Sequence, residues 1–144
     1  MPNMIETEIL IRAAPERVWE ALMDFAAYPG WNPFILAIEG SPRAGETLRV
    51  TMRPPGGSAQ TFKPKVLRAD APEAFVWRGS LPIPRLFTGT HSFQLTRTGD
   101  GTRLRQSESF SGILVPLLRK MLLRTEDGFN QMNAALKARA EARK

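Results

Sequence analysis

The hydrophobic pattern of this chain changes its period once, and that change most constrains the fold. Between Ile35 and Gly112, segments of alternating apolar and polar residues are separated by turn-forming stretches, which is typical of an antiparallel sheet. After Pro116 the apolar positions recur at spacings of four and three, which predicts one stripe of a long helix. Its members are Leu118, Leu122, Thr125, Phe129, Met132 and Leu136. We expect the apolar face of the sheet to pack against this stripe.

The first residues of the chain predict a strand followed by short helical pieces. Residues 5–12 alternate in the manner of a β-strand. Residues 13–25 predict a helix, because Pro15 suits a first helical turn and the apolar residues share one face. Two prolines and a glycine in residues 28–34 end this helix in a turn or in short helical pieces.

Prolines and glycines mark the ends of strands inside the sheet region. Residues 41–46 and 53–60 predict turns. Pro64 interrupts a strand pattern over residues 62–70, which favours an edge strand or a bulge. The proline-rich residues 81–87 (LPIPRLF) predict either a flexible lid over a pocket or a stiff connector.

The chain's one histidine lies on the predicted inner face of the last hairpin. Alternation places His91 on the same side as Phe93, and places Glu108 on the same side as Gln106 and Phe110. If the hairpin turn centres on the Gly-Asp pair of the TGDG segment, His91 and Glu108 are directly opposite, with Cβ atoms about 5 Å apart. A turn centred one residue later would make them diagonal neighbours about 7 Å apart.

Burying a polar side chain such as that of His91 or Glu108 costs free energy unless it pairs with another group, with water or with a ligand. Three interpretations of His91, Gln106 and Glu108 therefore stay open. They form a satisfied structural cluster, or they orient a bound ligand, or His91 and Glu108 act as an acid–base pair. A Ser-His-Asp triad is not expected, because Ser109 falls on the outer face of its strand.

Composition excludes several kinds of site. The length predicts a single domain over residues 1–144. No cysteine occurs, which excludes a disulfide scaffold and a thiolate metal site and fits a cytoplasmic protein. A single histidine and dispersed carboxylates predict no metal site. The chain carries no phosphate-binding or dinucleotide-binding fingerprint, so we expect no cofactor.

The formal net charge of +6 raises the question of an anionic partner. Part of this charge lies in residues 137–144 and the rest is scattered, so we expect a solvated surface and no nucleic-acid partner. Residues 112–123 are too short for a membrane span and include Arg119 and Lys120, so we expect no stable membrane insertion. The start of the sequence does not have the pattern of a signal peptide. A homodimer is left open.

Three stretches together resemble the START-like superfamily, also called SRPBCC or helix-grip domains. They are residues 14–34, 77–95 and 102–118. The resemblance extends over nearly the whole chain and is nearest to a bacterial group labelled polyketide cyclase/dehydrase and lipid-transport-like. It implies an α+β helix-grip fold, in which a curved seven-stranded antiparallel sheet surrounds a long C-terminal helix and two short helices follow the first strand.

The resemblance also implies an internal cavity for a hydrophobic or amphipathic small molecule. Trp31 falls where the family has its entrance region. Alternation in the strands and the helical stripe give the other residues that we expect to line this cavity: Val50, Met52, Phe75, Trp77, His91, Phe93, Gln106, Glu108, Phe110, Leu118, Leu122, Thr125 and Phe129.

Our leading prediction is a protein that carries, sequesters or senses a hydrophobic or aromatic small molecule. The first alternative is a cyclase or dehydratase-type enzyme, in which His91 and Glu108 move protons on a bound substrate. The second alternative is a protein-interaction module with a basic surface, whose interior serves only for packing.

Overall fold

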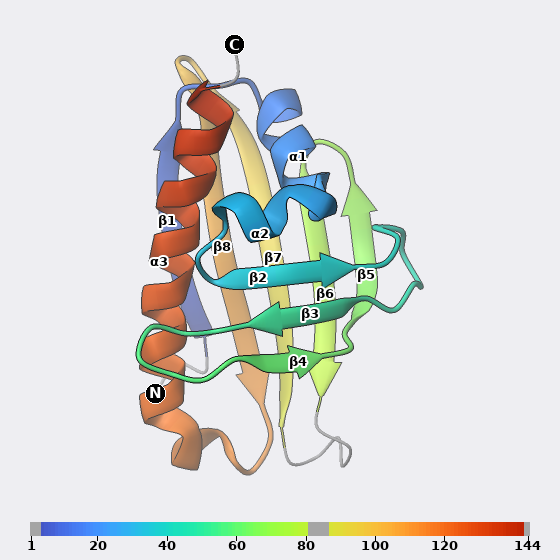
Figure 1. Ribbon diagram of the computed structural model, residues 1–144, viewed down its shortest axis with the longest axis vertical. Coiled ribbons are helices and arrows are strands. Elements are labelled where there is room, and N and C mark those ends of the chain that lie inside the picture. Colours follow the sequence, from blue (N-terminus) through green and yellow to red (C-terminus); the bar gives the residue numbers. More distant parts are fainter. Residues whose placement is uncertain (1–3, 81–86, 143–144) are drawn as a thin grey trace.

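The protein, described over residues 4–80 and 87–142 of a computed structural model, is an α+β molecule of two layers (Figure 1). The first layer is an antiparallel sheet of five strands in the order β1-β8-β7-β6-β5. These strands are β1 (Met4–Ile11), β5 (Lys65–Asp70), β6 (Ala74–Ser80), β7 (Thr88–Thr98) and β8 (Gly101–Ser111). The lid or connector predicted over residues 81–87 lies outside the described residues, apart from Phe87.

The second layer contains a smaller antiparallel sheet in the order β2-β3-β4. Its strands are β2 (Ile35–Glu39), β3 (Arg49–Met52) and β4 (Gln60–Phe62). They cross in front of the five-stranded sheet at a large angle (Figure 1). An antiparallel bridge between Thr47 and Lys65 joins the two sheets.

The expectation of a single seven-stranded sheet is wrong in its strand count, because the described residues form eight strands in two sheets. The extra division falls at Pro64, between the end of β4 and the start of β5. Proline has no N–H to donate to a ladder, so the pairing cannot continue through it. The carbonyl of Pro64 instead accepts a hydrogen bond from the backbone N–H of Leu48, at 2.8 Å. The prediction of an edge strand is confirmed, because β4 and β5 are each the last strand of their sheet.

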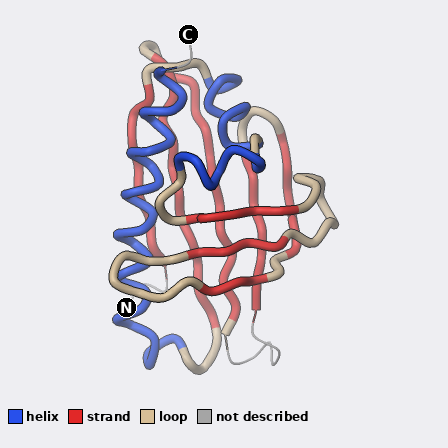
Figure 2. The backbone as a smooth tube through the Cα atoms, viewed as in Figure 1, coloured by secondary structure: helices blue, strands red, loops and turns tan. Residues whose placement is uncertain are grey.

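The helices share the second layer with the small sheet, on one side of the five-stranded sheet (Figure 2). They are α1 (Pro15–Met23), the 3₁₀ turn η1 (Phe25–Ala27), α2 (Tyr28–Trp31), the 3₁₀ turn η2 (Val115–Leu118) and α3 (Arg119–Ala142). The two short helices after the first strand are confirmed. The long helix begins later than predicted, because Pro116 lies in η2. Among the described helices, none combines the length and apolar content that a bilayer-spanning helix needs.

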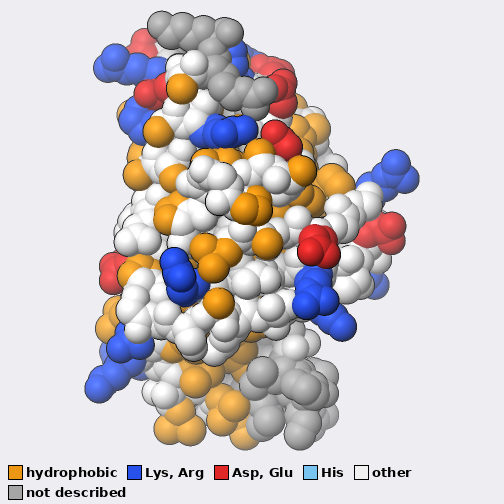
Figure 3. Space-filling view, in the orientation of Figure 1, with side chains coloured by type: hydrophobic (Ala, Val, Ile, Leu, Met, Phe, Trp, Pro, Cys, Tyr) orange, Lys and Arg blue, Asp and Glu red, His pale blue; other side chains and the backbone are white. Residues whose placement is uncertain are grey.

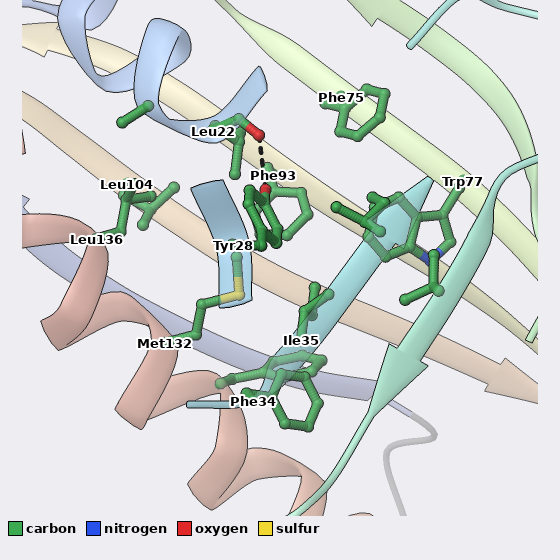
Figure 4. Packing of buried hydrophobic residues seen from close by; sticks show 14 of the residues in the cluster. Leu22, Tyr28, Phe34, Ile35, Phe75, Trp77, Phe93, Leu104, Met132 and Leu136 are labelled. Atoms are coloured by element: carbon green, nitrogen blue, oxygen red, sulfur yellow. Dashed lines mark hydrogen bonds between the residues drawn. The ribbon is translucent and has the colours of Figure 1, made fainter. Parts of the chain in front are cut away.

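The core lies between the two layers (Figure 4). The five-stranded sheet contributes aromatic rings, the short helices and β2 contribute side chains from the front, and α3 contributes its apolar stripe. The hydroxyl of Tyr28 donates a hydrogen bond of 2.6 Å to the carbonyl of Leu22, which ties α2 to the end of α1. Burial raises the pKa of Tyr28 well above its ordinary value, so this hydroxyl stays a donor.

Candidate functional site

The register of the β7–β8 hairpin sets the geometry of the site. Thr98 pairs with Gly101, so Gly99 and Asp100 are the central residues of the turn. His91 is therefore directly opposite Glu108, and Phe93 is opposite Gln106. The first of the two predicted registers is confirmed.

The ring of His91 is fully buried and is enclosed by aromatic rings. Trp77 on β6 stacks against it, with ring centroids 4.8 Å apart and an interplanar angle of 27°. Phe93 on β7 lies at 4.7 Å and Phe129 on α3 at 4.8 Å. Sheet and helix therefore meet at this imidazole, which packs much as a small aromatic residue would.

A chain of hydrogen bonds begins at Nε2 of His91. This nitrogen lies 2.9 Å from Oε1 of Gln106, and Nε2 of Gln106 donates to Oδ1 of Asn133 at 2.7 Å. Nδ2 of Asn133 donates to the hydroxyl of Thr7 at 2.8 Å. That hydroxyl donates to the backbone carbonyl of Gln106, also at 2.8 Å. The chain connects β7, β8, α3 and β1.

This chain of donors determines where the proton of His91 lies. The amide nitrogen of Gln106 is used to donate to Asn133, so its oxygen faces the imidazole as an acceptor. Nε2 of His91 must then be the protonated nitrogen, and Nδ1 carries the lone pair when the ring is neutral.

Nδ1 of His91 faces the carboxyl group of Glu108. The distance from Nδ1 to Oε1 is 3.3 Å, but the angles do not make a hydrogen bond, and the buried Nδ1 has no hydrogen-bond partner among the residues that the structure describes. The contact is attractive only when one of the two groups carries a proton, because a lone pair and a carboxylate repel each other. The Glu108 carboxyl therefore lies beside the unpartnered nitrogen of His91, and the Glu108 side chain reaches solvent with an exposed fraction of 16%.

The position of the Glu108 carboxyl group depends on the absence of a side chain at Gly89. A Cβ atom placed on Gly89 would lie 2.3 Å from Oε2 of Glu108 and 3.6 Å from Cδ1 of Phe110. The carboxyl group therefore occupies space that a side chain at position 89 would fill. Next to it, the rings of Phe110 and Phe87 pack with centroids 5.7 Å apart.

The predicted site residues fall into two groups by burial. The buried members belong to the interior, where Trp77, Phe93 and Phe129 contact the His91 ring. They are Val50, Phe75, Trp77, His91, Phe93, Gln106, Phe110 and Phe129. The half-buried members lie toward the surface; they are Trp31, Met52, Glu108, Leu118, Leu122 and Thr125. Trp31 makes its ring contact with Tyr28, at 5.2 Å, and not with the rings around His91. The hydroxyl of Thr125 donates to the carbonyl of Met121 on its own helix.

Two members of the polar chain, Thr7 and Asn133, were not predicted as site residues. Each carried a signal, because each is a polar residue at a position where the local period expects an apolar one. Thr7 alternates with the isoleucines of β1. Asn133 follows Phe129 by four residues and precedes Leu136 by three, which puts it beside the buried stripe of α3.

Two surface hollows are lined by described residues. One, of about 590 Å³, lies over hydroxyl-bearing residues and Arg78 on β6, β7 and β8, and reaches Phe110. The other, of about 560 Å³, lies between the start of α1 and the ends of β5, β6 and β7. Neither is lined by His91 or Gln106, so the ligand volume between the sheet and α3 stays a prediction.

The family model described as polyketide cyclase / dehydrase and lipid transport matches residues 4–141. No curated protein sequence matches this chain. Among solved structures, protein MLL2253 from Mesorhizobium loti is 22% identical, with a TM-score of 0.75 and 98% of each chain covered. A protein from Thermus thermophilus, TTHA0849, is 19% identical, with a TM-score of 0.75, covering 96% of this chain and 97% of that one. The di-domain ARO/CYC BexL, from the BE-7585A biosynthetic pathway, is 17% identical; the TM-score is 0.76, and the match covers 98% of this chain and 50% of BexL. These similarities show the fold.

Proposed function

Since the chain belongs to the polyketide cyclase/dehydrase and lipid transport family, we propose that it binds a hydrophobic or aromatic small molecule between its sheet and α3. The proposal includes one polar group on the ligand, which His91 and Glu108 recognise. The absence of cysteine suits a reducing cytoplasm, where we expect the protein to act.

The observation that carries the proposal is the unused hydrogen-bonding position of His91. In the hydrogen-bond network that links His91, Gln106, Asn133 and Thr7, every other side-chain polar atom has a partner. Nδ1 of His91 is buried without a hydrogen bond to any described residue. Buried polar groups are normally paired, and an exception calls for an explanation. A ligand hydroxyl beside Nδ1 and Glu108 can donate a hydrogen bond to this nitrogen and so supplies the missing partner.

Burial along α3 supports an entry point at the start of that helix. Phe129, Met132 and Leu136, from the middle of the helix onward, are fully buried. Leu118 and Leu122, on the same stripe, are only half-buried. An apolar ligand that separates these two leucines from the sheet would gain the contacts that they lack, at roughly 25 cal/mol for each Å² of apolar surface that it buries.

Native mass spectrometry of freshly purified protein, followed by organic extraction, tests the proposal. We expect a stoichiometric small molecule with an aromatic or aliphatic body and at least one hydroxyl group. Glu108→Gln keeps the shape but removes the charge and should change the retained fraction. Glu126→Gln, at an exposed position of α3, is the control and should match the parent. A clean apo mass together with no binding of the apolar dye anilinonaphthalene sulfonate would contradict the proposal and favour the interaction module.

A second candidate, an enzyme of the cyclase or dehydratase type, rests on the proximity of His91 and Glu108. Nδ1 of His91 and Oε1 of Glu108 are 3.3 Å apart, so a substrate bound beside them would meet two groups of the kind that give and take protons. BexL, which has the same fold, is an ARO/CYC protein of a biosynthetic pathway. The distinction is kinetic: Glu108→Gln abolishes turnover of the extracted compound or its precursor in an enzyme, and changes only its affinity in a carrier.

A further inference from the structure

Large apolar side chains are exposed together at one end of the molecule. Ile113, Leu117 and Leu123 have exposed fractions of 72%, 79% and 62%, and Met121 has one of 36%. All four lie within eleven consecutive positions, in the loop after β8, in η2 and in the first turns of α3. Hydrophobic side chains gather at this end in the space-filling view (Figure 3).

This grouping differs from the rest of the described surface. The other exposed large hydrophobics, Met4, Leu10, Phe62 and Leu67, are distributed over three different strands. Single exposed apolar residues are normal, whereas a contiguous patch marks a contact surface. We call residues 113–124, which hold the four exposed apolar residues, the apolar–basic end.

The charges of this segment are all positive. Arg119, Lys120 and Arg124 alternate with the exposed apolar residues, and no acidic residue occurs between Glu108 and Glu126. Lys120 and Arg124 are exposed and form no ion pair within the described part of the chain. Acidic side chains are also missing from this end of the face that Figure 3 shows.

We propose that the apolar–basic end docks onto the surface of an anionic lipid bilayer. Exposed leucine, isoleucine and methionine side chains can enter the boundary between headgroups and acyl chains. The stems of Lys120 and Arg124 are long enough to keep their charges at the anionic headgroups while their neighbours are inserted. This is surface docking and involves no spanning helix.

Charge complementarity favours a bilayer over a second copy of the chain. A symmetric dimer through this end would bring Lys120 and Arg124 of one copy against the same residues of its partner. Like charges brought together in this way oppose association. A nucleic acid would satisfy the charges but leave the four apolar side chains without a partner.

The apolar–basic end lies next to the proposed ligand entry, so docking there would bring the entry to the bilayer. Leu118 and Leu122, half-buried on the inner side of the same segment, are where the proposed ligand enters. A protein seated here on a bilayer would open its entry toward the lipid phase, where hydrophobic molecules dissolve. The docking itself does not require the His91–Glu108 site, so its test is independent of ligand binding.

Co-sedimentation of the protein with vesicles tests the proposal. We expect binding to equimolar phosphatidylcholine and phosphatidylserine, weak binding to phosphatidylcholine alone, and loss of binding as the salt concentration rises. Lys120→Glu with Arg124→Glu should lower partitioning at least thirtyfold, from about one kilocalorie per basic residue. Ile113→Ser with Leu117→Ser should lower it on the same vesicles at every salt concentration.

The controls have matched chemistry elsewhere on the surface. Arg43→Glu with Arg49→Glu reverses two other exposed charges, and Leu10→Ser removes an exposed leucine of β1; these variants and Glu108→Gln should bind like the parent. If the control variants lose as much vesicle binding, the net charge of the protein alone explains the effect and the proposal is wrong. Failure to bind anionic vesicles, or a dimer that Ile113→Ser with Leu117→Ser dissociates, would also overturn it.

Discussion

An added Cβ on Gly89 would lie 2.3 Å from Oε2 of Glu108, so the carboxyl group that faces His91 is seated over a residue without a side chain. Gly89 is on β7, two residues before His91, and Glu108 is on β8. The glycine therefore helps to hold the carboxyl group beside the imidazole, a role that its place in a strand pattern alone does not suggest.

Gly89→Ala should displace Glu108 from His91. The new methyl group takes the place of the carboxyl, which can swing toward solvent because it is already partly exposed. The ¹⁵N spectrum of the His91 ring should then report a changed environment at Nδ1 and an unchanged protonated Nε2.

Gly79→Ala is the matched control, since Gly79 pairs with Gly89 across β6 and β7. A Cβ there would meet only Cβ of Pro64, at 3.7 Å. We expect the two variants to differ in unfolding free energy by about 1 kcal/mol, with Gly89→Ala the less stable. Identical ring spectra in both variants would contradict the role given to Gly89.

Asn133→Leu should destabilise the protein by about 1–3 kcal/mol, although leucine is apolar and similar in volume. The substitution leaves Nε2 of Gln106 and the hydroxyl of Thr7 buried with one partner fewer. Asn130→Leu, at an exposed position of the same helix, should change the unfolding free energy by less than about 0.5 kcal/mol. Urea denaturation of both variants measures the difference, and equal values would mean that the polar chain contributes nothing to stability.

Gly128→Ala should also destabilise the fold, against the usual trend in helices. Alanine is favoured over glycine in a helix by about 1 kcal/mol. Here the new Cβ would lie 2.4 Å from Cδ1 of Phe34, and overpacking of this kind costs about 1–3 kcal/mol.

A double-variant cycle identifies the cause. In the Phe34→Leu background, Gly128→Ala should lower the unfolding free energy by less than in the parent, because the ring that the new Cβ would overlap is absent. Gly30→Ala serves as a control, since no atom of a described residue outside its own helical turn and chain neighbours lies within 4 Å of the added Cβ. A cost for Gly128→Ala that is the same with and without Phe34 would contradict this account.

Glu141 should contribute a pH-dependent part of the stability. The backbone N–H of Arg12 donates to its carboxylate at 2.7 Å, and this bond, together with that from Lys137, lowers the pKa of Glu141 below its ordinary value. A carboxyl whose pKa is lower in the folded state stabilises the fold above its unfolded pKa, and this contribution is lost as the pH falls through the lowered value.

Glu141→Gln should therefore be less stable than the parent at neutral pH and should approach it under acid conditions. Denaturant midpoints across the acid range measure this convergence, and Glu126→Gln is the control. A deficit that persists unchanged at acid pH would show that the charge of Glu141 is not responsible.

The pairing of His91 with Glu108 could be predicted because it depends on local information. Side chains alternate along a strand, and a tight turn limits the register of a hairpin, so Glu108 was expected either opposite His91 or diagonal to it, and the structure has it opposite. The long helix could be predicted for the same reason, since its period is visible in a single segment. Pro64 signalled a break, but whether a break divides one sheet into two depends on the angle between strands far apart in the sequence.

The contacts between elements were decided by the tertiary structure. Asn133 contacts Gln106 and Thr7 because of how α3 is turned about its own axis and how far it is shifted along the sheet. The 3.6-residue period of the helix fixes neither its rotation nor its shift. Phe34 rests against Gly128 for the same reason.

The sequence by itself therefore determined the long helix, the inner faces of the last hairpin, and a choice of two registers for His91 and Glu108, since these follow from backbone geometry over short distances. Only the tertiary structure decided which nitrogen of His91 holds the proton and which apolar residues stay exposed at residues 113–124. Both depend on how the helix and the sheet fit together, and packing between distant segments leaves no period in the sequence to read.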